Sequence, residues 1–132
     1  MGDAGEHYAL SQFAFAGLPA LKMPDGWTAY DLAVEPGNGL LRVSVKTRAE
    51  SEKWAANSWF IFDDRRECDW IVFLFKPYDG TPEAWVMPFE VAKANANQPG
   101  PTRKDPHNRD VSYRTLMRRL ARYRSNWGLV EA

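Results

Sequence analysis

The chain has 132 residues, of which 45% are hydrophobic and 26% charged, and its 17 Lys and Arg balance 17 Asp and Glu. The length predicts one domain, 1–132, and the zero net charge excludes a general electrostatic attraction to nucleic acid or membrane, although residues 103–132 are locally basic. A single cysteine excludes an internal disulfide and a cysteine-based zinc site. The first residues lack a basic start and a long apolar run, so we expect no signal peptide and a cytoplasmic protein.

The first predicted element is a helix from Asp3 to Ala16. Asp3 can cap its start, and Gly17, followed by Leu-Pro, is typical of a helix end. The residues expected to face the core are Ala9, Leu10 and Phe13.

A β-hairpin is predicted next. It consists of a strand over 27–35, a Pro-Gly-Asn-Gly turn over 36–39 and a strand over 40–48.

The second half alternates short apolar runs with turn signals. The predicted elements are a short strand at 58–62, a charged turn at 63–67, strands at 68–76 and 84–88, a helix at 89–97, a loop at 98–108 and a final helix from Asp110 to Ser125. The run at 68–76 is apolar on both faces, as in a central strand covered on both sides. Apolar residues recur at steps of three and four along the final helix. The order predicts a mixed α/β fold with helices against a central sheet.

Two charged residues lie at unusual places in the hairpin. Asp31 lies among apolar residues of the first strand, where Asp is disfavoured and costly to bury without a partner. Lys46 shares a face of the second strand with Arg42, Ser44 and Arg48, opposite the apolar face. A solvated face would explain Lys46 alone. Asp31 requires a partner, which is either Lys46 across the hairpin or a cation.

Glu6 is the third residue that could join such a site. It lies in line with the apolar stripe of the first helix and faces the sheet. The alternative is a capping box in which Asp3 caps the helix and Glu6 reaches back to its amide. Two acidic oxygens and a backbone carbonyl can hold Mg²⁺, which activates water and stabilises charge on a phosphodiester oxygen. Lys46 would position that water or neutralise the transition state.

The segments "GE…A…F" (5–13), "YDL" (30–32) and "RVSVKT" (42–47) resemble the PD-(D/E)XK nuclease superfamily. The similarity is to small single-domain members related to archaeal Holliday-junction resolvases and homing-type endonucleases. It covers the first half of the chain closely and extends to "CDWIVFLF" (68–75). The resemblance implies a restriction-endonuclease-like core, in which a mixed sheet is flanked by helices.

The resemblance also implies roles for individual residues. Asp31 and Ser44 would be the metal-ligand pair, with the backbone carbonyl of Val45 as a further ligand. Lys46 would be the catalytic lysine and Glu6 the helix carboxylate. The expected cofactor is Mg²⁺ or Mn²⁺. The expected partners are DNA and a second copy of the chain, with no membrane and no nucleotide cofactor.

The sequence departs from the family pattern at two positions. Ser44 stands where the family usually has Glu, Asp or Gln, and Tyr30 stands where the superfamily name has Pro. If Asp31 and Ser44 bind one ion, we expect their oxygen atoms to lie about 4 to 5 Å apart.

Three functional hypotheses follow. The leading one is a metal-dependent DNA endonuclease. Ser44 motivates the second, a catalytically inactive nuclease-like module that binds nucleic acid or a protein. The third is a plain interaction domain in which Asp31 and Lys46 form a structural ion pair.

Basic side chains outside the site are candidates for nucleic-acid binding. These are Arg48 and Arg42 on the hairpin strand, and Arg114 and Arg118 on the final helix. Arg114 and Arg118 recur every four residues and could follow a phosphate backbone. The alternative for any one of them is a solvated face whose long stems cover apolar surface.

Overall fold

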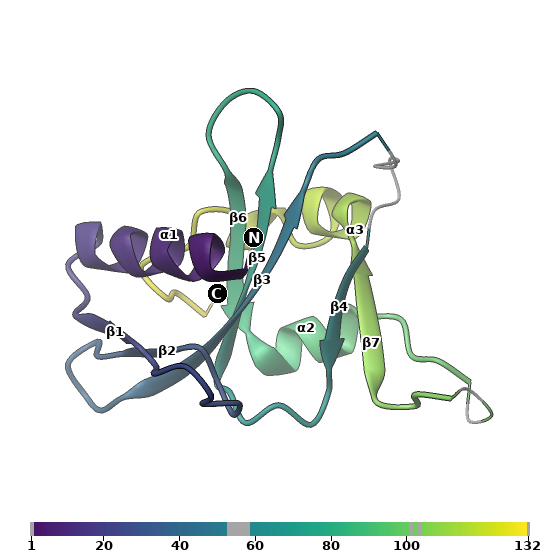
Figure 1. Cartoon of the computed structure of the whole chain (residues 1–132), viewed down its shortest axis with the longest axis horizontal. Coiled ribbons are helices and arrows are strands. Elements are labelled where there is room, and N and C mark those ends of the chain that lie inside the picture. The colour runs from purple at the N-terminus through teal and green to yellow at the C-terminus, as the bar shows by residue number, and fades with distance from the viewer. Residues whose placement is uncertain (1, 53–58, 101, 103, 132) are drawn as a thin grey trace.

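A computed structural model describes residues 2–52, 59–100, 102 and 104–131. Its elements, shown in Figure 1, are α1 (Gly2–Phe15), β1 (Ala20–Lys22), β2 (Leu32–Val34), β3 (Leu41–Ala49), β4 (Trp59–Asp63), β5 (Trp70–Lys76), β6 (Glu83–Pro88), α2 (Phe89–Asn95), β7 (Asn108–Ser112), α3 (Tyr113–Arg118) and the 3₁₀ turn η1 (Ala121–Tyr123).

Five strands form one mixed sheet in the order β1-β2-β3-β5-β6. The predicted hairpin is present, because β2 and β3 are antiparallel with Leu32 opposite Val43. β3 and β5 are parallel with Val45 opposite Val72, and β6 is antiparallel to β5. β4 and β7 form a separate antiparallel pair. The predicted fold class, a mixed central sheet flanked by helices, is confirmed.

The large sheet separates two hydrophobic cores, to which side chains of β5 contribute alternately. Trp70, Val72 and Leu74 pack on the side of α1. Ile71, Phe73 and Phe75 pack on the side of β4, β7 and α2. β5 is therefore covered on both faces, as its apolar sequence predicts.

Helix α1 lies close against β3. A Cβ atom added at Gly5 would lie 1.9 Å from Thr47 Oγ1, so the absence of a side chain at Gly5 permits this approach. Ala9 and Phe13 are fully buried on the same helix face. Gly17 ends the helix with a φ of 85°, where the Leu18 N–H donates to the Phe13 carbonyl. This packing brings the start of α1 to the hairpin.

The first hairpin strand is shorter than predicted. Only Leu32–Val34 is a strand, and Ala20–Lys22, which we had not predicted as a strand, pairs with it along its other edge. The segment between them is a turn-rich connection with Gly26 at a φ of 87°. Pro24 and Gly26 favour a turn, which reaches Trp27 because the Trp27 N–H donates to the Pro24 carbonyl, so the strand does not begin at residue 27 as predicted.

The predicted final helix from Asp110 to Ser125 is also wrong. Asn108–Ser112 is strand β7, and the Ser112 hydroxyl caps the short helix α3 by accepting from the Thr115 N–H at 3.0 Å. The apolar stripe is buried as expected, but in two different cores. Leu116, Leu120 and Tyr123 pack on one face of the sheet and Trp127 on the other.

The chain crosses from one face to the other at the edge of β6. The Ser125 N–H donates to the Ala84 carbonyl at 2.8 Å, and Ser125 has a φ of 52°. A continuous helix would keep its stripe on one face, so it could not supply both cores. Among the described residues, no helix is long and apolar enough to cross a bilayer.

Candidate active site

Asp31 lies just before β2, and its main chain is held from both sides. Its N–H donates to the Val43 carbonyl and its carbonyl accepts from the Met23 N–H, both at 3.0 Å. Its carboxylate is turned toward β3, where Oδ2 accepts from the Val45 N–H at 2.8 Å and from the Ser44 hydroxyl at 3.3 Å. The hairpin register therefore fixes Asp31 against Ser44 and Val45, two of the residues grouped with it from the sequence.

Asp31 forms an ion pair with Arg66, a residue that no sequence pattern indicated. Arg66 follows β4, and its Nη2 lies 3.4 Å from Asp31 Oδ2 and 3.1 Å from Ser44 Oγ. Only the charged character of segment 63–67 pointed to this region, and nothing in that run distinguishes Arg66 from its neighbours. Tertiary folding alone brings it across 35 positions to Asp31.

Lys46 is half-buried on the same face of β3 as Ser44. Burial lowers the pKa of its ammonium group, and the positive charge of Arg66 lowers it further, while Asp31 opposes both effects. Over the described residues, no ion pair joins Lys46 to Asp31. Lys46 is thus a charge near the carboxylate and is not its direct partner.

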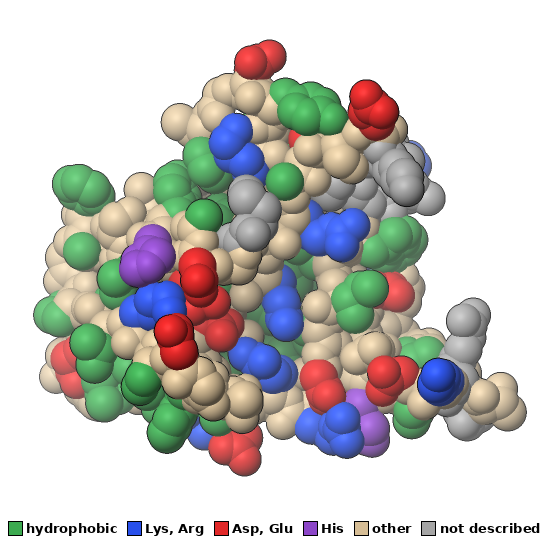
Figure 2. Space-filling view, viewed as in Figure 1, with side chains coloured by type: hydrophobic (Ala, Val, Ile, Leu, Met, Phe, Trp, Pro, Cys, Tyr) green, Lys and Arg blue, Asp and Glu red, His purple; other side chains and the backbone are tan. Residues whose placement is uncertain are grey.

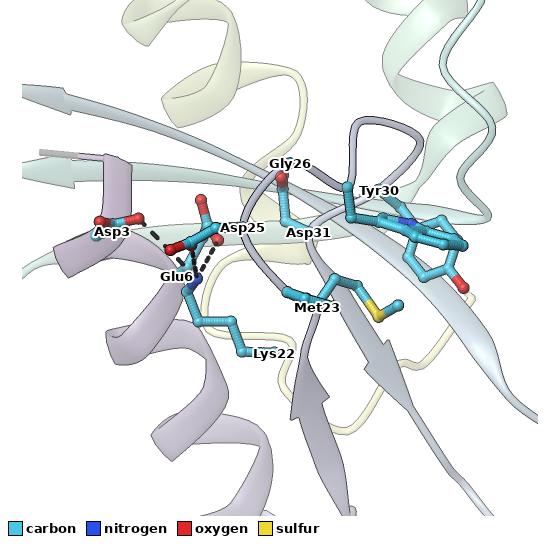
Figure 3. Close-up of a pocket in the computed structure, with 10 residues that line it drawn as sticks. Asp3, Glu6, Lys22, Met23, Asp25, Gly26, Tyr30 and Asp31 are labelled. Carbon is cyan, nitrogen blue, oxygen red and sulfur yellow. Dashed lines mark ion pairs between the residues drawn. The ribbon is translucent and has the colours of Figure 1, made fainter.

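Glu6 and Asp31 line the same pocket, which has a volume of about 190 Å³. Figure 3 shows Glu6 entering from α1 and Asp31 from the start of β2. Lys22 on β1 also lines it, at 3.5 Å from Glu6, 3.8 Å from Asp25 and 4.0 Å from Asp3. Burial raises the pKa of Glu6, and the charge of Asp31 adds to this, while Lys22 opposes the increase.

The helix start also bears on the capping-box alternative. α1 begins at Gly2, so Asp3 lies inside the first turn and not before it. Glu6 points to Lys22 in the pocket. Lys22 was not predicted, because its strand was not predicted.

The oxygen atoms present suit a hard divalent cation. Mg²⁺ is commonly bound through one or two carboxylates with water in the other positions. Asp31 and Glu6 share a pocket in which added positive charge would relieve their repulsion. In this structure the positive charge against Asp31 and Ser44 is the guanidinium of Arg66.

The Asp31–Ser44 spacing differs from the expected 4 to 5 Å. The oxygen atoms are 3.3 Å apart because the hydroxyl donates to the carboxylate. Neighbouring ligands of an octahedral Mg²⁺ lie about 3 Å apart, so this distance suits two adjacent positions of one ion. Three His, Cys, Asp or Glu side chains do not gather into a metal-holding group anywhere in the described part of the chain. Water would therefore have to complete the coordination.

The four arginines proposed for nucleic-acid binding lie on different parts of the fold. Arg42 forms a two-contact ion pair with Asp69, with Nε and Nη2 at 3.2 and 3.0 Å from its oxygens. Arg48 is exposed further along β3. Arg114 and Arg118 are exposed on α3.

The face that contains the pocket carries both signs of charge. Figure 2 shows Lys and Arg side chains following one another down the middle of this face, with a group of Asp and Glu beside them. A phosphate backbone would meet positive charge along the middle and repulsion at the acidic side.

Two nucleases of known structure are similar to this chain in fold. The bacterial homing endonuclease I-Ssp6803I is 22% identical, with a TM-score of 0.64 over 96% of this chain and 87% of its own. Hjc, a Holliday junction resolvase from the archaeal hyperthermophile Archaeoglobus fulgidus, is 14% identical, with a TM-score of 0.54 over 86% and 84%. No protein-family model and no curated protein sequence matches the chain. The expected restriction-endonuclease-like fold is therefore confirmed.

Proposed function

We propose that the protein is an endonuclease that hydrolyses phosphodiester bonds of DNA with Mg²⁺ or Mn²⁺. The observation that carries the proposal is the placement of Asp31 against Ser44 and Val45, with Lys46 two residues further along the same face of β3. The fold shared with a homing endonuclease and a Holliday junction resolvase supports it.

Each residue has a distinct proposed role. Asp31 and Ser44 would hold the ion, with the Val45 carbonyl and Glu6 as further oxygen donors. The ion, when bound, would activate water and stabilise negative charge on the phosphate. Lys46 would balance the charge that develops on the reacting phosphate. Its half-buried position strengthens that interaction, because water screens it less than it would at an exposed site.

The test is a cleavage assay on duplex, single-stranded and branched DNA. We expect cleavage with Mg²⁺ or Mn²⁺ and none with a chelator. Asp31→Asn and Lys46→Ala should each lower the rate by about 10²- to 10³-fold, the usual cost of losing one charge-stabilising group.

Two variants serve as matched controls for this assay. Asp79→Asn changes an exposed carboxylate outside the site, and Lys93→Ala changes a lysine that pairs with Glu90 on α2. Both should cleave at the wild-type rate. A wild-type protein that is inert on all three DNA forms with both metals would contradict the proposal.

The second candidate is a nuclease-like module that binds nucleic acid or a protein without cleaving. The neutral Ser44 at a ligand position and the guanidinium of Arg66 beside Asp31 favour it. Under this alternative, DNA binding measured by fluorescence anisotropy would be the same with and without Mg²⁺. Calorimetry would then detect no Mg²⁺ binding by the protein.

A further inference from the structure

Arg66 is held less firmly than two comparable arginines of this fold. Arg65 contacts Asp63 through Nε and Nη2 at 3.0 and 2.7 Å, and Arg42 uses the same two atoms on Asp69. These are two-contact carboxylate pairs, the strong form of this interaction. Arg66 instead reaches Asp31 with Nη2 alone, at 3.4 Å, which is longer than the usual range for a charged hydrogen bond.

The remaining contacts of Arg66 are also incomplete. The same Nη2 atom is shared with Ser44 Oγ at 3.1 Å. Its Nε is buried and has no hydrogen-bond partner among the described residues. A guanidinium offers five N–H groups in a fixed fork, and here the buried Nε–H is left without an acceptor in the described part of the chain. The positive charge of Arg66 also repels the positive charge of Lys46 nearby.

The guanidinium lies against the two side-chain oxygens that are proposed to bind the ion. Its Nη2 is within 3.4 Å of Asp31 Oδ2 and of Ser44 Oγ, the two side-chain oxygens proposed as neighbouring ligands. A divalent ion on the same two oxygens would repel the guanidinium at close range.

The fold offers the displaced side chain another position. Arg66 also lines a second pocket, of about 260 Å³, together with Asp63 and Glu67. Asp63 already pairs with Arg65, so Glu67 is the carboxylate that could receive the guanidinium after it leaves Asp31.

We propose that Arg66 is the resident cation of the Asp31–Ser44 site in the metal-free protein, and that a divalent ion binds only in competition with its guanidinium. The identity of the ion rests on the proposed function. The competition itself rests on the contacts of Arg66, and it makes Arg66 the residue that sets the metal affinity of the site.

The test measures Mn²⁺ binding without DNA, by calorimetry or by the electron paramagnetic resonance signal of free Mn²⁺. Arg66→Gln should lower the Kd for Mn²⁺ about tenfold (about 1.4 kcal/mol), within the usual range of coupling between two ligands. Arg65→Gln is the matched control, because it removes the adjacent arginine, which pairs with Asp63. It should leave the Kd unchanged. Asp31→Asn combined with Arg66→Gln should abolish binding.

The outcome separates this inference from the proposed function. Equal or weaker Mn²⁺ binding by Arg66→Gln overturns the competition, even if the wild type cleaves DNA. Tighter binding by Arg66→Gln supports it, even if the wild type cleaves nothing. Absence of Mn²⁺ binding in both proteins also overturns it. Circular dichroism checks that the variant is folded, and Arg66→Met, which keeps the apolar stem, provides a second substitution that should give the same tenfold effect.

Discussion

At the scale of single residues, both carboxylates of the candidate site are partnered by cations that their own elements do not supply. Glu6 on α1 pairs with Lys22 on β1, and Asp31 pairs with Arg66 beyond β4. The need of Asp31 for a partner follows from its apolar neighbours in the sequence alone. The identity of that partner depended on where the chain returns after β4.

The pair of Arg42 with Asp69 should make stability depend on pH. Hydrogen bonds from Arg42 lower the pKa of Asp69, although partial burial opposes them. The unfolded protein, with an Asp pKa of about 3.9, then binds a proton at higher pH than the folded protein does. The stabilisation is therefore complete above about pH 3.9 and is lost as the pH falls through the lowered pKa.

Asp69→Asn tests this in urea unfolding at several pH values. Because both side chains are partly exposed, we expect a loss of only about 0.5 to 1 kcal/mol at pH 7. The difference in the free energy of unfolding between the variant and the wild type should disappear in acid, where the wild-type carboxyl is also neutral. A difference in unfolding free energy that stays constant from pH 7 to pH 2 would show that the charge of Asp69 contributes nothing to stability.

At the scale of elements, the packing of α1 on β3 determines where Glu6 lies. Gly5 faces Thr47 so closely that an added Cβ would also lie 3.0 and 3.2 Å from its Cβ and Cγ2. Rotation of the Thr47 side chain would move Oγ1 but not Cβ, so the 3.0 Å contact with Cβ would remain. The helix would have to move away from the strand and carry Glu6 with it.

Gly5→Ala should lower the free energy of unfolding by about 1 to 3 kcal/mol, the usual cost of overpacking. Alanine is the better helix former, so a loss would come from packing and not from helix propensity. Gly2→Ala on the same helix is the control, since nothing lies within 4 Å of an added Cβ. It should change stability by less than about 0.5 kcal/mol. Equal stability of the two variants in urea would contradict the close approach.

At the scale of the whole molecule, the two cores share one sheet. Strand β5 supplies side chains to both, and the C-terminal segment passes from one core to the other around β6. Neither core can lose its packing without exposing the strand that supports the other. This arrangement favours cooperative unfolding of the two cores.

We expect one thermal transition, with the same midpoint by far-ultraviolet circular dichroism and by tryptophan fluorescence. Trp85 reports on one core and Trp70 on the other, so fluorescence follows both. A calorimetric enthalpy equal to the van't Hoff enthalpy would support a two-state process. Two separate transitions would mean that the cores unfold independently.

The sequence by itself determined the features that depend on nearby residues. These are the helix end at Gly17, the hairpin that brings Asp31 beside its second strand, and the doubly covered strand predicted at 68–76, because turn chemistry and side-chain alternation act over a few positions. Only the tertiary structure decided which face the last apolar residues cover and which cation Asp31 meets. Periodicity predicts that a residue is buried, but not on which side of the sheet it lies, as Leu120 and Trp127 illustrate. An ion pair across 35 positions leaves no local signal, and for that reason Arg66 could be found only in the folded chain.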